Sequence, residues 1–444
     1  MSFPPGRAIL VLLFIACATA IPITLRPRAA RSDLVFWTFS PFEINQPAID
    51  AFEKQTGEPV SCKLLSTRAL DTRLLSQFMS PARDVEGPDL VEIEIGSIGK
   101  FFRPSVDQIW FVPLNDLLHR SGLDAQLLPA RIEPWSKEGI VFGLPQDVHP
   151  VSLTYRKDLF DAASIDPARC ETWMQLQGAC AQFNRFWAAH GNPNRLAMML
   201  SQSAADDLIV MLQQRHVQLL DGQNGVHLNQ PIVARTMLQY ASMVAGDRAV
   251  AGEASPGEFR WARDIERGDL CMFLSPDWKA DQLKSVAPAL AGKMAMIPLP
   301  KFDPGDASTG SWGGTMIGLP RQGKHQQAAW ALAEMLTTHP LAERIPPLPA
   351  RWSDPIYHQP DSFFGGQSID DLYIHLAEQL PPRTVTSFST LADTELADVL
   401  HQAVQMQRDF PARSGDDPEA LRQCEQWLNS AADDLRDRIR LSSF

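Results

Sequence analysis

The chain has 444 residues, of which 45% are hydrophobic and 21% are charged, so it has the composition of a globular protein with room for two or three ordinary domains. Its 52 acidic residues outnumber its 40 basic residues and give a formal net charge of −12. Because phosphate binding needs a basic surface, this balance argues against nucleic acid as a partner.

The N-terminal segment has the pattern of an export signal. Arg7 precedes an apolar run over residues 8–19, and Ala18-Thr19-Ala20 has the small-x-small form of a cleavage site. We therefore expect a signal peptide over residues 1–20 and a spacer over residues 21–32. Cys17 lies in a loose lipoprotein box, and arginines follow the apolar run instead of preceding it, so a lipid or membrane tether stays open.

The remaining five cysteines give no metal-binding pattern. None forms a CxxC pair or a Cys/His cluster with the spacing of a zinc site, so neither a metal nor a cofactor is expected. Cys170 and Cys180 are near enough in sequence to form a disulfide after export. The sequence is equally compatible with free, buried thiols at both positions.

The first elements alternate between strand and helix. Residues 34–39, 60–65 and 88–95 are apolar and predict strands, and residues 68–79 predict a helix between the second and third strands. Asn45 is predicted to cap an earlier helix that ends at Gly57. This βαβαβ order predicts a mostly parallel sheet with helices on both faces.

Residues 139–160 predict two short buried strands, 140–142 and 151–155. A polar segment with a proline at each end separates them. Farther along, residues 346–352 are too rich in proline for regular structure. Amphipathic helices are predicted in the C-terminal part, over residues 369–380, 394–406 and 418–435.

The 139–160 segment resembles the crossover of the family 1 extracellular solute-binding proteins, the sugar-binding partners of ABC importers. The matching residues are Gly143, Leu144, Pro145, Tyr155, Lys157, Asp158, Leu159 and Phe160. Arg156 stands where the family usually has Asn. Further matches follow the family's order along the chain, at residues 52–57, 88–91, 112–117, 268–272 and 296–300, then at Gly313-Gly314 and residues 315–319.

The resemblance implies an α/β fold of type II, the two-lobe periplasmic-binding-protein fold, in which each lobe is a mostly parallel sheet flanked by helices. A hinged cleft would separate the lobes. The N-terminal lobe would hold residues 33–145 and 315–345, and the C-terminal lobe residues 146–314 and 346–444.

Aromatic side chains are the first candidates for ligand contacts, because sugar rings present apolar C–H faces that flat rings can cover. Trp37 ends the first strand, although a half-buried strand tryptophan would read the same way. Trp278 follows Ser275-Pro276-Asp277, and the resemblance puts it in the cleft. Trp312 lies beside Gly313, where glycine permits close approach of a ligand or serves hinge flexibility.

Polar candidates could satisfy sugar hydroxyls. Asp147 lies in the crossing between the two strands, where a turn or hinge role is the alternative. Glu92 and Glu94 alternate on the third strand and point to one face, either toward the cleft or along an exposed edge. Arg351 could clamp hydroxyls or remain an ordinary surface residue.

Catalytic patterns are absent from the sequence, which has no nucleophile elbow, zinc-protease motif, P-loop or dinucleotide fingerprint. Together with this absence, the resemblance implies a non-enzymatic, periplasmic or surface-tethered monomer that delivers a carbohydrate to the permease subunits of an ABC importer by hinged closure. Two alternatives stay open. The protein could be a ligand-sensing subunit that docks on a membrane receptor, or a secreted carbohydrate-active enzyme with two carboxylates facing across the cleft.

Overall fold

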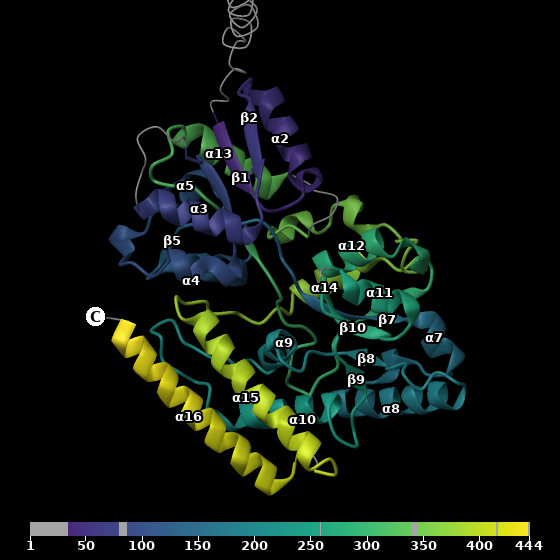
Figure 1. Ribbon diagram of the computed structural model, residues 1–444. Coiled ribbons are helices and arrows are strands. Elements are labelled where there is room, and N and C mark those ends of the chain that lie inside the picture. Colours follow the sequence, from purple (N-terminus) through teal and green to yellow (C-terminus); the bar gives the residue numbers. More distant parts are fainter. Residues whose placement is uncertain (1–33, 80–86, 258, 340–344, 414–415, 443–444) are drawn as a thin grey trace, which may run out of the picture.

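The computed structural model describes residues 34–79, 87–257, 259–339, 345–413 and 416–442. These residues form two α/β lobes, which lie one above the other in Figure 1. The predicted signal peptide and spacer lie outside the described residues. Within the described ranges, no helix combines the length and the apolar character needed to cross a membrane.

The first lobe is built on a five-stranded sheet with the order β2-β1-β3-β12-β6. The strands are β1 (Leu34–Thr38), β2 (Val60–Leu64), β3 (Leu90–Glu94), β6 (Leu144–Pro145) and β12 (Thr315–Gly318). β1 pairs in parallel with both β2 and β3, whereas β12 runs antiparallel between β3 and β6. The sheet is therefore mostly parallel, and its one reversed strand returns from the other lobe.

Helices cover both faces of this sheet. One core cluster joins the sheet to α2 (Phe42–Thr56), α5 (Asn115–Ser121) and α13 (Gln326–Thr338), and a second joins it to α3 (Thr67–Met79) and α4 (Ile98–Phe101). The short helix α6 (Pro129–Ile132) and the two-stranded hairpin β4 (Ser136–Lys137) and β5 (Ile140–Val141) complete the lobe.

The predicted start of the first helix was wrong. α2 begins at Phe42, three residues before Asn45, and its N-cap is Pro41. Asn45 does not cap the helix, because its amide donates to the Glu92 carboxylate at 2.9 Å and to the Thr38 hydroxyl at 3.3 Å. The Asn45 side chain donates to these acceptors elsewhere in the fold and does not provide the local helix cap that the sequence alone predicts.

The second lobe contains a three-stranded sheet in which β7 (Val151–Arg156) lies between β10 (Met272–Pro276) and β11 (Met294–Ile297). Both pairings are antiparallel, so these three strands differ from the mostly parallel sheet expected here. β10 and β11 run in the same direction and are joined by α12 (Asp277–Val286), whereas β7 enters between them from the other lobe. A parallel pair, β8 (Met198–Met199) and β9 (Ala251–Gly252), lies alongside.

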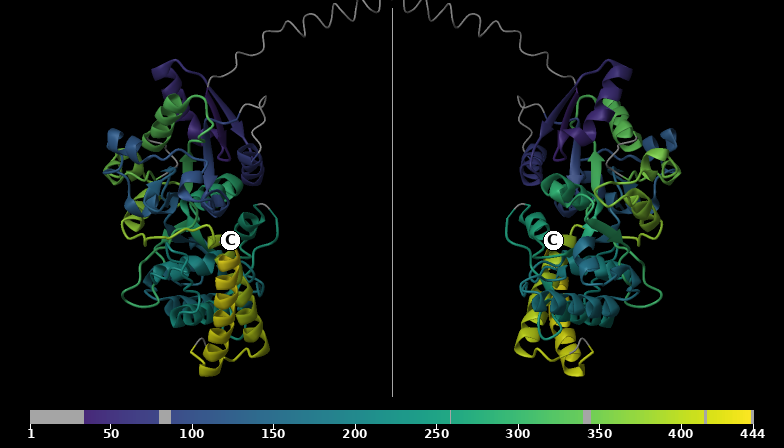
Figure 2. Two further views of the ribbon diagram at one scale, coloured as in Figure 1. Left: turned by 90° about the vertical axis from the view of Figure 1, so that its left-hand side faces the viewer. Right: turned by 90° about the vertical axis from the view of Figure 1, so that its right-hand side faces the viewer.

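Helices make up most of the second lobe. They are α7 (Lys157–Ala162), α8 (Trp173–Ala189), α9 (Asp206–Gln214), α10 (Pro231–Val244), α11 (Arg260–Arg267), α14 (Ile369–Ala377), α15 (Ser389–Asp409) and α16 (Pro418–Ser442). The largest core cluster joins α10, α15 and α16 to the sheet, and both side views in Figure 2 show the last two helices against the lower lobe. The three predicted C-terminal helices are thus confirmed, and the last two extend beyond their predicted ends.

Two of the segments that connect the lobes, the crossing segments, lie side by side. Residues 146–150 lead from β6 to β7, and residues 311–314 lead back to β12. The Trp312 amide donates to the His149 carbonyl at 3.2 Å, and the Gln146 amide donates to the Thr315 carbonyl at 3.0 Å. Since the paired segments carry the chain from one sheet to the other, the residues between them lie where the lobes meet.

Candidate functional site

A buried polar network lies at the crossing. The His149 ring lies between two carboxylates, with Nε2 3.1 Å from Asp147 Oδ2 and Nδ1 2.5 Å from Asp277 Oδ1. Arg131, which is 1% exposed, donates through Nε to the Asp147 carbonyl at 3.0 Å and lies 3.4 Å from its carboxylate. The Thr315 amide donates to Asp147 Oδ1 at 3.2 Å. Asp147 and its partners therefore tie both crossing segments to α6 and α12.

The charges in this network favour a protonated histidine. Burial opposes the imidazolium, but the carboxylates of Asp147 and Asp277 outweigh it and raise the pKa of His149 to about 9. At neutral pH the network therefore holds a positive imidazolium between two carboxylates. Asp277 Oδ2 is also buried, and no residue in the described part of the chain donates a hydrogen bond to it.

Two half-buried tryptophans adjoin the network. Trp278 is the second residue of α12, directly after Asp277, and Trp312 precedes the glycine pair of the second crossing segment. Their rings meet edge to face with centroids 6.0 Å apart, and Trp278 Nε1 donates to the Trp312 carbonyl at 3.1 Å. Gly313 has a φ of +98°, and a Cβ there would lie 3.2 Å from both the His149 ring and Trp278 Nε1. The structure thus brings together Asp147, Trp278, Trp312 and Gly313.

Lys279 adds a positive charge beside the tryptophans. Its Nζ lies 4.7 Å from the centre of the Trp312 ring, 5.2 Å from that of Trp261 and 5.3 Å from that of Phe273. The residue is 7% exposed, and among the described residues none makes a hydrogen bond or ion pair with its ammonium. Burial lowers its pKa, which the charges of Asp207 and Asp206 oppose. Its N–H donors therefore contact aromatic faces and have no oxygen acceptor among the described residues.

Glu92 does not join this group. It is 0% exposed, and its carboxylate accepts hydrogen bonds from the Thr38 hydroxyl at 2.5 Å, the Phe39 amide at 3.1 Å, the Ser40 amide at 3.0 Å and the Asn45 side chain at 2.9 Å. These donors come from its own lobe and fix the loop between β1 and α2. Glu92 therefore lies buried beneath the loop between β1 and α2, and it points neither to the cleft nor to an exposed edge.

Trp37 also lies apart from the crossing. It is 5% exposed and packs in the first-lobe cluster that includes Leu70 and Leu74 of α3. Lys63 lies over its ring, 5.4 Å from the centroid. In this arrangement the side chain serves packing, because helix α3 covers the face of the sheet to which the ring points.

Arg351 contacts residues near the end of α13 and not the group at the crossing. Its Nε lies 2.7 Å from Asp354 Oδ2, and its Nη1 donates to the Thr338 carbonyl at the C-terminal end of α13 at 2.6 Å. The guanidinium therefore caps a helix end near the connection between the lobes, and the structure does not bring it to the tryptophan pair.

The cysteines and possible metal ligands add no further site. Cys170 and Cys180 are both free thiols, so the structure does not contain the bridge that their spacing allowed. In the described ranges, no group of three or more His, Cys, Asp and Glu side chains is arranged to hold a metal ion.

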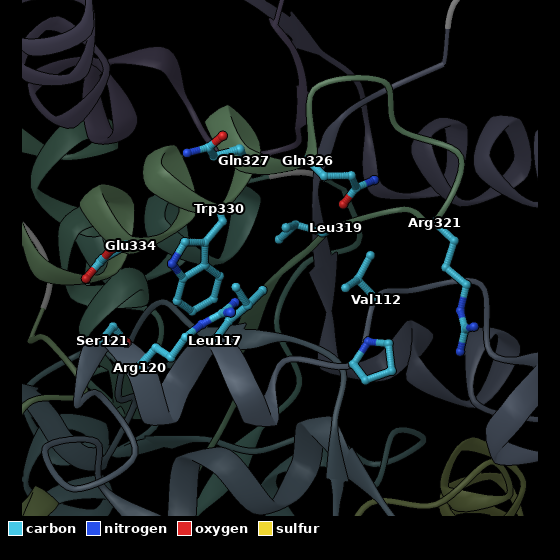
Figure 3. Close-up of a pocket in the computed structure, with 11 residues that line it drawn as sticks. Val112, Leu117, Arg120, Ser121, Leu319, Arg321, Gln326, Gln327, Trp330 and Glu334 are labelled. Atoms are coloured by element: carbon cyan, nitrogen blue, oxygen red, sulfur yellow. The ribbon is translucent and has the colours of Figure 1, made fainter.

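A separate groove of about 880 Å3 lies on the first lobe between α5 and α13, and Figure 3 shows Trp330, Arg120 and Glu334 along it. Every residue that lines it comes from 112–121 or 319–334, within one lobe. None of the predicted site residues lines this groove, so it is distinct from the group at the crossing.

Four members of the group at the crossing were not among the predicted site residues: Arg131, His149, Asp277 and Lys279. Asp277 and Lys279 flank Trp278, so the sequence around that tryptophan carried a usable signal. Arg131 carried none, because it lies on a four-residue helix that no sequence pattern links to the crossing. Only the fold brings its side chain to Asp147.

Comparisons with known proteins agree with this architecture. Residues 43–343, more than half of the chain, match the model of the bacterial extracellular solute-binding protein family. The arabinooligosaccharide-binding protein of Halalkalibacterium halodurans is 21% identical over 90% of this chain and 89% of its own, and the lactose-binding protein of Rhizobium radiobacter is 24% identical over 69% and 72%.

Solved structures match over most of the chain. A binding protein associated with an ABC transporter from B. animalis subsp. lactis, in complex with β-1,6-galactobiose, has a TM-score of 0.70 and 17% identity over 91% of this chain and 98% of its own. The sugar-binding protein MalE of Xanthomonas citri has a TM-score of 0.70 and 18% identity over 92% and 99%. At these identities the structures establish the fold, and the family match establishes membership. The chain belongs to the bacterial extracellular solute-binding protein family.

Proposed function

We propose that this protein binds an oligosaccharide between its two lobes and delivers it, outside the cytoplasm, to the permease subunits of an ABC importer. The observation that carries the proposal is the half-buried Trp278–Trp312 pair at the junction of the lobes, with Lys279 and Asp277 beside it. Tryptophan rings can cover the apolar faces of sugars, while the ammonium and the carboxylate can bind hydroxyls.

The relatives support a carbohydrate as the ligand class. The names of two of them specify arabinooligosaccharides and lactose, and one solved neighbour holds β-1,6-galactobiose. All of these are sugars of two or more units, which fits a site that draws side chains from two crossing segments and from α12. Since identity stays near 20%, the particular sugar is left to experiment.

Closure of the two lobes is the proposed mechanism. Residues 33–145 and 315–345 would move as one lobe and residues 146–314 and 346–444 as the other, with the paired crossing segments as the hinge. A ligand held by one lobe would recruit the other, and the closed monomer would be the form that the permease recognises.

A thermal-shift screen of the protein from about Ser32 onward tests the proposal. The panel contains arabinooligosaccharides, lactose, β-1,6-galactobiose and maltose, with a polyamine and an amino acid as ligands of other classes. A sugar that binds only the folded state raises the melting temperature as its concentration increases. A shift with the polyamine or amino acid alone would overturn the carbohydrate assignment, and no shift with any compound would favour a receptor-docking role.

A further inference from the structure

The segment between α14 and α15, residues 378–388, forms a strap that starts on the second lobe. The Thr384 amide donates to Gln218 Oε1 at 3.0 Å, and the Gln218 side chain in turn donates to the Pro382 carbonyl. Phe388, at the end of the strap, is 8% exposed and packs in the large core cluster of the second lobe. The strap is therefore anchored to the second lobe through Pro382 and Thr384 and at its C-terminal end.

The middle of the strap contacts the first lobe. The Thr384 hydroxyl donates to Glu133 Oε1 at 3.3 Å, and Val385 packs against the first-lobe core cluster that contains Phe101. Just beyond the strap, the Thr390 hydroxyl donates to the Gly96 carbonyl at 3.2 Å. A second-lobe segment thus makes polar and apolar contacts with the residues that follow β3, far in sequence from the crossing segments.

Gly99 makes the closest approach. A Cβ on this residue would lie 2.8 Å from the Ser387 carbonyl oxygen, a distance too short for a carbon and a backbone oxygen. Its backbone is helical, in α4, so only the strap on the opposite lobe restricts its side chain. Contacts this close form when the lobes are together and are lost when they separate.

The strap also carries a cation without a direct partner. Arg383 borders a small cavity of about 40 Å3 together with Thr384, Ser389 and Asp393. Among the described residues, none makes a hydrogen bond or ion pair with its guanidinium. The carboxylates whose charges act on it belong to both lobes: Glu94 at the end of β3, and Asp393 and Asp206 on the second lobe.

The charge of Arg383 does not offset the effect of burial on the pKa of the neighbouring Asp393. Burial raises the pKa of Asp393 to about 6, even though the charge of Arg383 acts to lower it. A guanidinium in direct contact would hold that pKa below its usual range. Glu94 ends β3 in the first lobe and Asp393 lies on α15 in the second, so a molecule bound between the lobes could offer hydroxyl groups to both carboxylates and to Arg383.

We propose that the strap borders the interlobe site, where it and the start of α15 contact Glu133 and Gly96 of the first lobe, and that Arg383 on it contacts the ligand. The proposal rests on the oligosaccharide-binding function proposed above and extends it. Trp278 and Trp312 would hold one part of the ligand, and Arg383 would bind hydroxyls of another. A ligand that reaches both would have more than one sugar unit.

Gly99→Ala tests the strap without changing a ligand contact. Its new methyl group would meet the Ser387 carbonyl only in the closed form, so we expect roughly tenfold weaker oligosaccharide binding by calorimetry. Gly178→Ala is the matched control, because Gly178 lies in helix α8 with nothing within 4 Å of an added Cβ. Equal affinities for Gly99→Ala and the wild type would overturn the strap.

Arg383→Gln and Arg383→Lys test the contact. We expect each to weaken binding of the oligosaccharide by about tenfold or more, with a smaller loss for the matching monosaccharide, since charge-assisted hydrogen bonds to the second unit are removed. An unchanged affinity for both sugars would overturn the role of Arg383.

Failure of the proposed function would be seen separately. If the wild type binds no carbohydrate, small-angle scattering of the unliganded proteins still tests the strap. A larger radius of gyration for Gly99→Ala than for the wild type and Gly178→Ala would support it, and identical values would overturn it.

Discussion

The buried carboxylate of Glu92 and the buried carboxylates at the crossing differ in how fully their hydrogen bonds are satisfied. Glu92 accepts four hydrogen bonds at 2.5–3.1 Å from donors of its own lobe, and it organises the loop after β1. The Asp147–His149–Asp277 network joins the crossing segments to both lobes and leaves Asp277 Oδ2 without a donor among the described residues. A satisfied buried acid stabilises a fold, whereas an incompletely satisfied one beside half-buried aromatic rings can also bind a ligand.

The largest expected effect on stability is at Glu92, whose hydrogen bonds are satisfied. Glu92→Ala would leave the Phe39 and Ser40 amides and the Asn45 side chain without their acceptor, and we expect the free energy of unfolding to fall by about 3–5 kcal/mol. Urea denaturation measures the change. Glu43→Ala, exposed in the first turn of the nearby helix α2, is the control and should lie near the wild type. A stable Glu92→Ala protein that fails to bind sugar would contradict the structural role given to Glu92.

The second effect concerns the crossing. The raised pKa of His149, about 9, means that the folded state keeps a proton that the unfolded chain loses near pH 6.5. This contribution to stability is complete below pH 6.5 and is lost as the pH rises through about 9, and it amounts to roughly 3 kcal/mol.

Denaturation measured across this range checks the sign and the size of the effect. His149→Gln should flatten the decline in stability, because the neighbouring Asp147 and Asp277 no longer hold a titrating ring between them. His401→Gln, exposed on α15, should keep it. A wild-type stability that rises from pH 6.5 to 9 would contradict the protonated network.

The smallest effect is expected at Arg351. This side chain pairs with Asp354 at a partly exposed position and caps the end of α13, so Arg351→Ala should cost about 1 kcal/mol or less. Sugar affinity should stay within twofold of the wild type. A loss of affinity as large as that expected for Trp278→Ala would extend the site beyond the crossing.

Much of the fold could be predicted because it depends on local patterns. The apolar strands at the start of the chain and the amphipathic helices at its end carry their own periodicity. The antiparallel pairings of β7 could not be predicted, since its partners lie more than 100 residues away. The start of α2 was missed because Asn45 binds Glu92, a contact that only the folded chain creates.

The residues of the candidate site also differ in whether local sequence or the fold determines their position. Asp147, Trp278, Trp312 and Gly313 lie on the crossing segments or directly after β10, so their place in the chain already indicated where the lobes meet. Glu92 and Trp37 had suitable positions on strands, but strand alternation does not say which loop or helix covers a face. Arg383 gave no signal, because its place depends on the strap reaching across from the second lobe.

The central claim is that a carbohydrate binds against the Trp278–Trp312 pair, and calorimetric titration tests it most directly. The titrated proteins are the wild type, Trp278→Ala and Trp427→Ala, a half-buried tryptophan of α16 that serves as the control. We predict that the wild type and Trp427→Ala bind the same oligosaccharide equally, and that Trp278→Ala binds it about tenfold more weakly or worse. Equal binding by all three proteins would contradict the site proposed at the crossing.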